Sequence, residues 1–178
     1  MRAVFRNPFL LAGGIVVLVV GFLLFRPDTL FTDVRAAESL EEAFATSTTG
    51  TAAAETTGGI ATTTAPVAEI VQLVSGAFVG IDHRASGTAT VYSQDGRYVL
   101  RFEDDTDIQN GPDLYVWMLP SDSYEGGIPE EYLDLGTLTG NLGGQNYQLP
   151  ENFDPAVHRT VLIWCLRFSV PFAAAPLA

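Results

Sequence analysis

The hydrophobic pattern of the chain centres on one apolar stretch near the C-terminus, residues 160–172. Its β-branched and aromatic residues favour a β-strand. Strand side chains alternate between two faces, so Val161, Ile163, Cys165 and Arg167 are expected to share one of them. The opposite face then carries Leu162, Trp164, Leu166, Phe168 and Val170. Because both faces are apolar up to Cys165, we expect this strand at the centre of a sandwich, with Arg167 marking the return to water.

Shorter alternating segments follow one another from residue 67 onward, separated by turn residues. An Asp95-Gly96 pair between residues 88–92 and 98–102 is a strong hairpin signal. Further strands are predicted over residues 76–82, 114–119, 135–138 and 147–149. No stretch from 67 to 178 has helical periodicity. The pattern predicts an all-β fold over residues 67–178, an antiparallel β-sandwich or jelly-roll-like domain.

The N-terminal part of the chain carries an unbroken apolar run over residues 9–25, flanked by Arg6 and Arg26. As a helix this run would extend about 25 Å, close to the thickness of a thin hydrocarbon core. The alternative is a cleavable signal peptide, but such peptides have shorter apolar regions and a small-residue cleavage site close behind. We therefore expect residues 1–26 to form an uncleaved transmembrane signal-anchor.

The residues that flank this run predict its orientation and the organisation that follows it. Arg2 and Arg6 precede the run, whereas acidic residues dilute the arginines after it. This predicts a single-pass cell-membrane protein with a cytoplasmic N-terminus and an extracytoplasmic C-terminal domain. Residues 33–44 have apolar side chains at helical spacing, and residues 46–66 are rich in Thr, Ala and Gly. Residues 27–66 are therefore expected to be a juxtamembrane segment and a flexible linker.

The charge and cysteine content narrow the classes of function. The 178 residues include 21 acidic and 9 basic ones, for a net charge of −12. Nucleic acid is an unsuitable partner, because phosphate binding needs a basic patch. The single cysteine, Cys165, excludes an intramolecular disulfide, and free cysteines are most often buried. Neither a hydrolase triad nor a phosphate-binding loop is present at motif spacing, so a stand-alone enzyme is not expected.

Two sets of side chains are candidate ligands. His83 and His158 are the only histidines. Together with Cys165 they could form a sparse metal or haem site, since thiolate and imidazole are common axial ligands. The alternative places His83 at a turn and His158 on a solvated loop.

The densest acidic stretch, residues 103–107, offers a second candidate. Asp105, Asp107 and the later Asp113 could supply oxygen ligands to calcium. However, Val116 stands twelfth from Asp105, where a helix-loop-helix calcium loop has glutamate. The alternative is a solvated loop, with Asp113 fixing the turn after a proline.

The order of short motifs along residues 74–177 resembles the DM13 domain. The matching positions are Gly76, Phe78, His83, Ala85, Ser86, Gly87, Tyr92, Leu100, Asn110, Gly111, Pro112, Asp113, Leu114, Tyr115, Val116, Leu135, Gly136, Gly140, Asn141, Gly144, Gln145, Tyr147, Leu149, Pro150, Trp164, Cys165, Phe168, Val170, Phe172 and Ala175. The piece over residues 110–116 is the most distinctive. One departure is Ala173, where the pattern leads us to expect glycine.

This resemblance implies an extracytoplasmic electron-transfer module whose cysteine takes part in redox chemistry. The candidate redox thiol is Cys165, and a working thiol needs a positive neighbour. Arg167 and His83 are the candidates, and the three residues together are the expected site for haem or for a thiol that works without a cofactor. We expect another redox protein as the electron partner.

A second hypothesis is a non-redox binding or adhesion module. In this hypothesis a face that carries Tyr92, Tyr115 or Trp117 would hold a carbohydrate, a small ligand or a protein partner.

Overall fold

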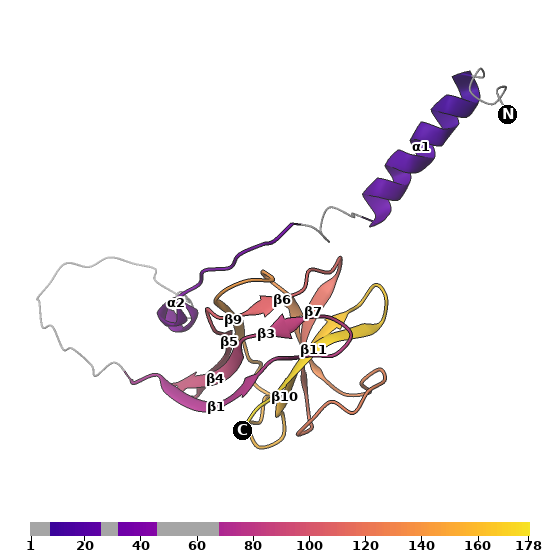
Figure 1. Ribbon diagram of the computed structural model, residues 1–178. Coiled ribbons are helices and arrows are strands. Elements are labelled where there is room, and N and C mark those ends of the chain that lie inside the picture. Colours follow the sequence, from indigo (N-terminus) through magenta and orange to yellow (C-terminus); the bar gives the residue numbers. More distant parts are fainter. Residues whose placement is uncertain (1–7, 26–31, 46–67) are drawn as a thin grey trace, which may run out of the picture.

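The computed structural model describes residues 8–25, 32–45 and 68–178 (Figure 1). The described parts contain two helices, α1 (Pro8–Phe25) and α2 (Leu40–Ala45), and a set of mostly short strands. The strands are β1 (Val71–Ala77), β2 (Val79–Gly80), β3 (Ala85–Ser86), β4 (Thr88–Gln94), β5 (Arg97–Phe102), β6 (Asp107–Ile108), β7 (Leu114–Leu119), β8 (Leu133–Thr137), β9 (Gln145–Gln148), β10 (Thr160–Cys165) and β11 (Val170–Pro176).

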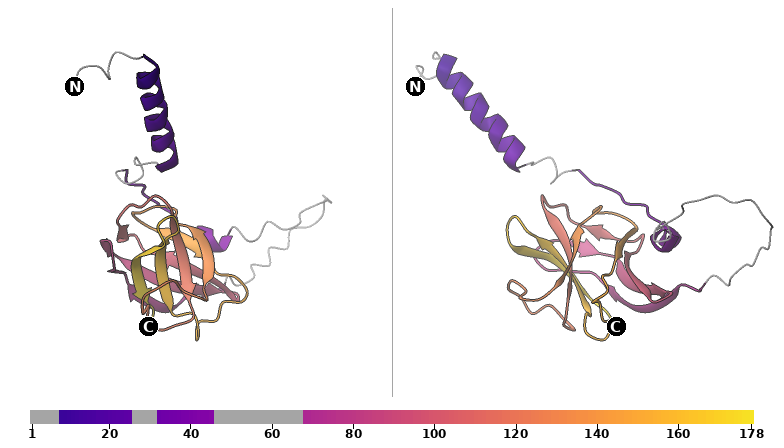
Figure 2. Two further views of the ribbon diagram at one scale, coloured as in Figure 1. Left: turned by 90° about the vertical axis from the view of Figure 1, so that its right-hand side faces the viewer. Right: turned by 180° about the vertical axis from the view of Figure 1, so that it is seen from behind.

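Two antiparallel sheets pack face to face, as the predicted sandwich requires (Figure 2). The first has the strand order β1-β4-β5-β9, the second β2-β11-β10-β7-β8, and β3 pairs with β6 in a small third sheet. β10 therefore lies in the centre of the second sheet, between β11 and β7. This position confirms the prediction made from its two apolar faces.

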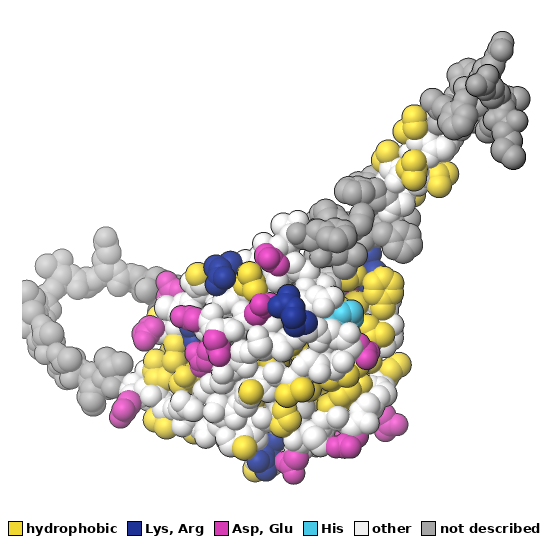
Figure 3. Space-filling view, in the orientation of Figure 1, with side chains coloured by type: hydrophobic (Ala, Val, Ile, Leu, Met, Phe, Trp, Pro, Cys, Tyr) yellow, Lys and Arg dark blue, Asp and Glu magenta, His cyan; other side chains and the backbone are white. Residues whose placement is uncertain are grey.

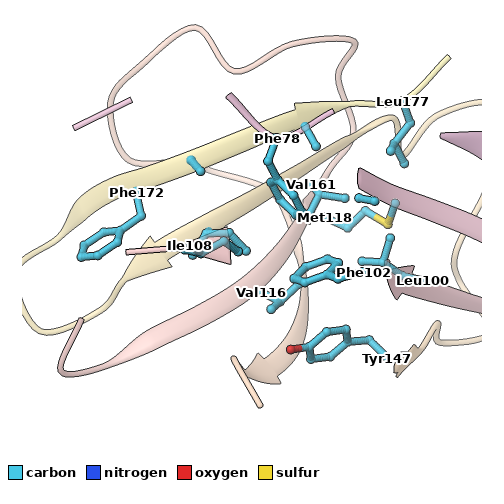
Figure 4. Close-up of a cluster of buried hydrophobic side chains, with 14 of the residues drawn as sticks. Phe78, Leu100, Phe102, Ile108, Val116, Met118, Tyr147, Val161, Phe172 and Leu177 are labelled. Carbon is cyan, nitrogen blue, oxygen red and sulfur yellow. The ribbon is translucent and has the colours of Figure 1, made fainter. Parts of the chain in front are cut away.

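The core fills the space between the two sheets (Figure 4). Phe102 and Leu100 enter it from β5, and Val116 and Met118 from β7, all fully buried. Phe78 meets the Phe102 ring edge-on at 4.8 Å between centroids. Val161, Ile163 and Cys165 face this core, whereas Leu162 and Trp164 pack in a second cluster on the outer side of the sheet. The predicted alternation of β10 is therefore confirmed up to Cys165.

The hairpin between β4 and β5 also follows the sequence signal. Asp95 has φ 52° and Gly96 has φ 74°, the left-handed pair that a two-residue type I′ turn requires. In contrast, the strand predicted over residues 76–82 is divided between the end of β1 and the two-residue β2. Gly76 makes this path possible, because a Cβ there would lie 1.9 Å from the Pro176 carbonyl oxygen.

Residues 32–45, which the sequence assigned to the linker region, pack against the first sheet (Figure 1). Residues 32–39 are extended, and α2 occupies only the last part of the helix predicted over 33–44. Ser39 and Glu42 form a capping box: the Glu42 N–H donates to Ser39 Oγ at 3.3 Å, and the Ser39 N–H donates to Glu42 Oε2 at 3.5 Å. Phe44, only 3% exposed, is buried against Val99. We call residues 32–45 the docked segment.

The two remaining predictions concern the N-terminal region. Among the residues that the structure describes, no helix is both long and apolar enough to cross a membrane. The transmembrane signal-anchor predicted over residues 1–26 therefore finds no support there. The Thr/Ala/Gly-rich linker, residues 46–66, lies outside the described residues.

Candidate functional site

Cys165 is the last residue of β10 and is fully buried. It pairs with Leu114 at the start of β7 and with Val170 at the start of β11. Its side chain belongs to the core between the sheets. The structure therefore places the candidate redox thiol in an apolar environment, at the end of the sandwich where the segment of residues 110–116 enters its strand.

Arg167 does not share a strand face with Cys165, and the prediction that it would is wrong. β10 ends at Cys165, and residues 166–169 form the turn into β11. Ser169 has φ 53°, a left-handed conformation that reverses the chain. Both Arg167 and Phe168 are exposed in this turn. Sequence alternation could not reveal this, because the tight turn interrupts an apolar run that otherwise reads as one strand.

His83 lies on the loop after β2 and is half-buried. Its imidazole stacks on the Phe172 ring with 3.7 Å between centroids, and Nδ1 lies 3.2 Å from Gln109 Nε2. Phe172 belongs to the same core cluster as Cys165. His83 is thus linked to that core through an aromatic contact.

His158 lies on the loop before β10, where its Nδ1 accepts a hydrogen bond from the Asp154 N–H at 3.1 Å. This contact agrees with the loop alternative for His158. Within the described ranges, no group of three or more His, Cys, Asp or Glu side chains is arranged to hold a metal ion. A metal site of His83, His158 and Cys165 therefore finds no support in this part of the chain.

The three candidate calcium ligands have separate roles. Asp105 accepts hydrogen bonds from the Thr88 N–H and hydroxyl group, both at 3.1 Å. Asp107 forms an ion pair with Arg84 at 2.9 Å. Asp113 is one of the residues that line a cavity of about 340 Å³, whose walls include residues 110–114 and 137–141. The first two carboxylates thus hold loops together.

The aromatic side chains of the binding-module hypothesis do not form one exposed face. Trp117 is 3% exposed and is stacked on Tyr132 at 3.9 Å and on Trp164 at 5.2 Å. Tyr92 lies on β4 in the other sheet and donates its hydroxyl hydrogen bond to Glu103. Tyr92 and Trp117 therefore lie on different sheets and do not share a face, whereas Tyr115 on β7 is half-buried against the cluster that contains Trp117.

Residues 32–45 lie against the loop 138–144 and the strands β5 and β9, and we call this surface the groove. Its floor is the loop 138–144, which Gln145 holds in place from a fully buried position. The Gln145 amide exchanges two hydrogen bonds with the Gly140 backbone, at 3.1 and 2.7 Å. The Tyr147 hydroxyl donates to Gln145 Oε1 at 2.6 Å and accepts from the Thr139 N–H at 3.1 Å. Burial raises the pKa of Tyr147 to about 12, mainly because the phenolate would lose its hydration.

The docked segment lies in this groove and pairs with the loop through its backbone. The Leu142 N–H donates to the Val34 carbonyl at 3.2 Å, and the Ala36 N–H donates to the Leu142 carbonyl at 2.8 Å. The Glu38 N–H continues the series to the Gly144 carbonyl at 3.0 Å. The segment therefore extends the domain as an added strand does.

Arg101 is the charged residue at the centre of the groove and is only 8% exposed. Its guanidinium donates to Glu103 at 3.0 Å, to Asp104 at 2.9 Å, and to the Glu38 carbonyl and Asn146 Oδ1 at 2.9 and 3.1 Å. Its planar fork of donors thus connects the domain to the docked segment.

Several groove residues are among the positions that match the DM13 motifs, but the sequence alone indicated no role for them. The structure shows that Gly140, Asn141, Gln145 and Tyr147 build the groove, and that Arg101 completes it. The capping box of residues 39–42 was the available signal that the segment ends in a helix. No sequence signal identifies the partner of that helix, because the hydrogen bonds that hold it join residues 53 and 105 positions apart in the chain.

Comparison with known proteins places this fold in a family. No curated protein and no solved structure matches the chain. A family model described as "Electron transfer DM13" matches residues 77–177, more than half of the chain. That range contains Cys165, His83 and the groove residues from Arg101 to Gln148. The chain therefore belongs to the DM13 family, as the ordered motifs indicated.

Proposed function

We propose that this chain is an extracytoplasmic accessory domain of electron transfer, with Cys165 as its redox group and another redox protein as its electron partner. The observation that carries the redox role is the match to the electron-transfer family over residues 77–177. The described residues give no support to the expected haem, and the proposed chemistry uses the Cys165 thiol alone.

Two features support Cys165 within this proposal. It is the only cysteine of the chain, so any thiol chemistry must use it. It also lies at the end of the sandwich, paired with Leu114 of the most distinctive motif. Its complete burial sets a condition, because an oxidant meets the sulfur only when this end of the sandwich opens.

The chemistry is a two-electron oxidation at sulfur. The thiolate attacks a peroxide oxygen, the O–O bond breaks, and Cys165 becomes a sulfenic acid while the peroxide is reduced to water. A thiol of the partner protein then condenses with the sulfenic acid, which releases water and forms a mixed disulfide. A second partner thiol attacks this disulfide and restores Cys165.

The test measures how Cys165 becomes accessible in the folded full chain. We expect the rate of thiol labelling to be nearly independent of urea below the unfolding transition, because local opening exposes little surface. Mild peroxide should add one oxygen to Cys165, seen by mass spectrometry and reversed by an added thiol. The urea-unfolded chain serves as the reference for an accessible thiol.

A different pair of results would show that Cys165 has no redox role. If labelling follows global unfolding across the urea series and peroxide adds no oxygen, Cys165 is a core residue. Cys165→Ala would then reduce only stability, and the redox assignment of this residue would be withdrawn.

The proposal also includes a cell-membrane location with the domain outside. The apolar run over residues 9–25 and its arginine flanks support it. Protease added to intact spheroplasts is expected to remove a C-terminal tag. Complete protection of the tag, while a known outer-face protein is digested, would reverse the predicted orientation.

A further inference from the structure

The groove and its occupant belong to different parts of the chain. The residues that form the groove lie between Arg97 and Gln148, inside the range that matches the DM13 family. The docked segment, residues 32–45, lies outside that range. The family domain thus presents a groove, and a separate piece of this chain fills it.

The groove recognises mainly the backbone of its occupant. Besides the three backbone pairs, domain side chains reach carbonyl groups along the whole segment. Asn110 donates to the Thr32 carbonyl at 2.9 Å, Asn146 to the Ser39 carbonyl at 2.9 Å, Gln148 to the Ala43 carbonyl at 2.6 Å and Arg97 to the Phe44 carbonyl at 2.8 Å. Such contacts do not depend on the side chains of the occupant, so other sequences can make them.

Two glycines leave room for the occupant's backbone. A Cβ on Gly140 would lie 2.7 Å from the Val34 carbonyl oxygen and 2.9 Å from the Ala36 nitrogen. A Cβ on Gly143 would lie 2.4 Å from the Ala36 carbonyl oxygen. The three nearest atoms to a Cβ on Gly140 all belong to the docked segment, so this glycine serves the close approach of an extended chain.

A few side chains of the occupant supply specificity. Asp33 Oδ1 accepts from the Asn110 and Asn141 amides, both at 3.0 Å. Glu38 Oε2 accepts from the Asn146 N–H at 2.8 Å. Ala36 and Phe44 are buried, and the Arg97 guanidinium lies 5.6 Å from the centroid of the Phe44 ring. Counted from Asp33 as position one, the preferred occupant therefore has acidic side chains at positions one and six. It has a small residue at position four and an aromatic ring at position twelve.

The polar groups of the groove bind its occupant directly. Asn141 is 5% exposed, and its side chain binds the Val34 N–H at 2.7 Å as well as Asp33. Arg101 is similarly buried and uses one donor on the Glu38 carbonyl. When residues 32–45 leave the groove, these groups exchange their partners for water, so a competing segment with the same donors and acceptors can take over their hydrogen bonds. The carboxylates of the occupant are bound by neutral donors, the Asn110 and Asn141 amides and the Asn146 N–H. Recognition of the acidic groups is therefore local, on a surface where acidic side chains outnumber basic ones in the view of Figure 3.

We propose that this groove is a binding site for an extended acidic segment of a partner protein, and that residues 32–45 are its intramolecular occupant. A partner segment with the spacing of Asp33, Ala36, Glu38 and Phe44 displaces the docked segment and takes over its backbone pairing. The proposal does not depend on the redox role of Cys165.

The test uses the full chain and a fluorescent peptide with the sequence of residues 32–45. The Asp33→Ala/Phe44→Ala double variant loses two side chains that hold the docked segment, so the segment binds the groove more weakly. We expect this variant to bind the peptide about tenfold or more tightly than the wild-type chain, where the intact segment competes at high effective concentration. Fluorescence anisotropy measures both affinities, and circular dichroism checks that both chains are folded.

Matched changes in the groove and in the peptide locate the site. Adding Gly140→Ala to the double variant should abolish peptide binding. The control Ile128→Ala, at a position that is 68% exposed between β7 and β8 and outside the groove, should leave peptide binding unchanged. In the peptide, loss of the Asp33 or Phe44 side chain should weaken binding, whereas Ala37→Ser at an exposed position should not. Equal binding of a scrambled peptide, or full binding after Gly140→Ala, would overturn the proposal.

Hydrogen exchange on the wild-type chain gives a second readout if the double variant does not fold. Excess unlabelled peptide should increase exchange at the Ala36 and Glu38 amides, which are hydrogen-bonded only while the segment is docked. The Leu142 amide should stay protected, because the peptide replaces its acceptor. Unchanged exchange at Ala36 and Glu38 under saturating peptide would also overturn the proposal.

Discussion

Replacement of Arg101 by methionine is expected to lower the free energy of unfolding by about 3 kcal/mol. Methionine has a similar length but no donors, so the half-buried Glu103 loses its counter-charge and the Glu38 carbonyl its hydrogen bond. Asp104 contributes less to this loss, because its side chain is 87% exposed and stays hydrated. Urea unfolding, followed by tryptophan fluorescence, measures the difference.

Arg84→Met is the matched control for this prediction. Arg84 pairs with Asp107 at a similar distance, 2.9 Å, but the two side chains are 69% and 41% exposed. We expect this change to cost less than about 1 kcal/mol. Equal effects of the two substitutions would contradict the central role of Arg101 in holding the docked segment to the sheet.

The stability of the domain is expected to fall between about pH 10 and pH 12 because of Tyr147. Its pKa is about 12 in the folded chain, against about 10 in the unfolded chain. The folded state therefore holds this proton more tightly, and the resulting stability is complete below the unfolded pKa. It is lost as the pH rises through the folded pKa, and the total change is roughly 2–3 kcal/mol. Urea unfolding at a series of pH values measures it.

Tyr147→Phe separates this contribution from those of other groups that titrate at high pH. The variant lacks the hydroxyl that donates to Gln145, so we expect a loss of about 1 kcal/mol at neutral pH. Between pH 10 and pH 12 its stability should decline less than that of the wild-type chain. Parallel pH profiles for the two proteins would show that the Tyr147 proton is not linked to folding.

The two faces of β10 show why part of this fold can be predicted from sequence. Val161 and Ile163 alternate with Leu162 and Trp164, and the period of two places them on opposite sides of any strand. The Asp95-Gly96 turn is similarly local, since its positive φ angles follow from the residue types alone. The same reasoning failed for Arg167, because an apolar run does not reveal a tight turn within it.

The sequence by itself determined the all-β sandwich, its central strand, the principal hairpin and the DM13 membership, because these rest on periodicity, turn chemistry and the order of motifs. Only the tertiary structure decided that Cys165 is buried while Arg167 lies in a turn. It also decided that residues 32–45 fill a groove built around Arg101 and Asn141. The physical reason is that these contacts join residues far apart in the chain, many of them through backbone groups, and backbone groups leave no pattern in the sequence.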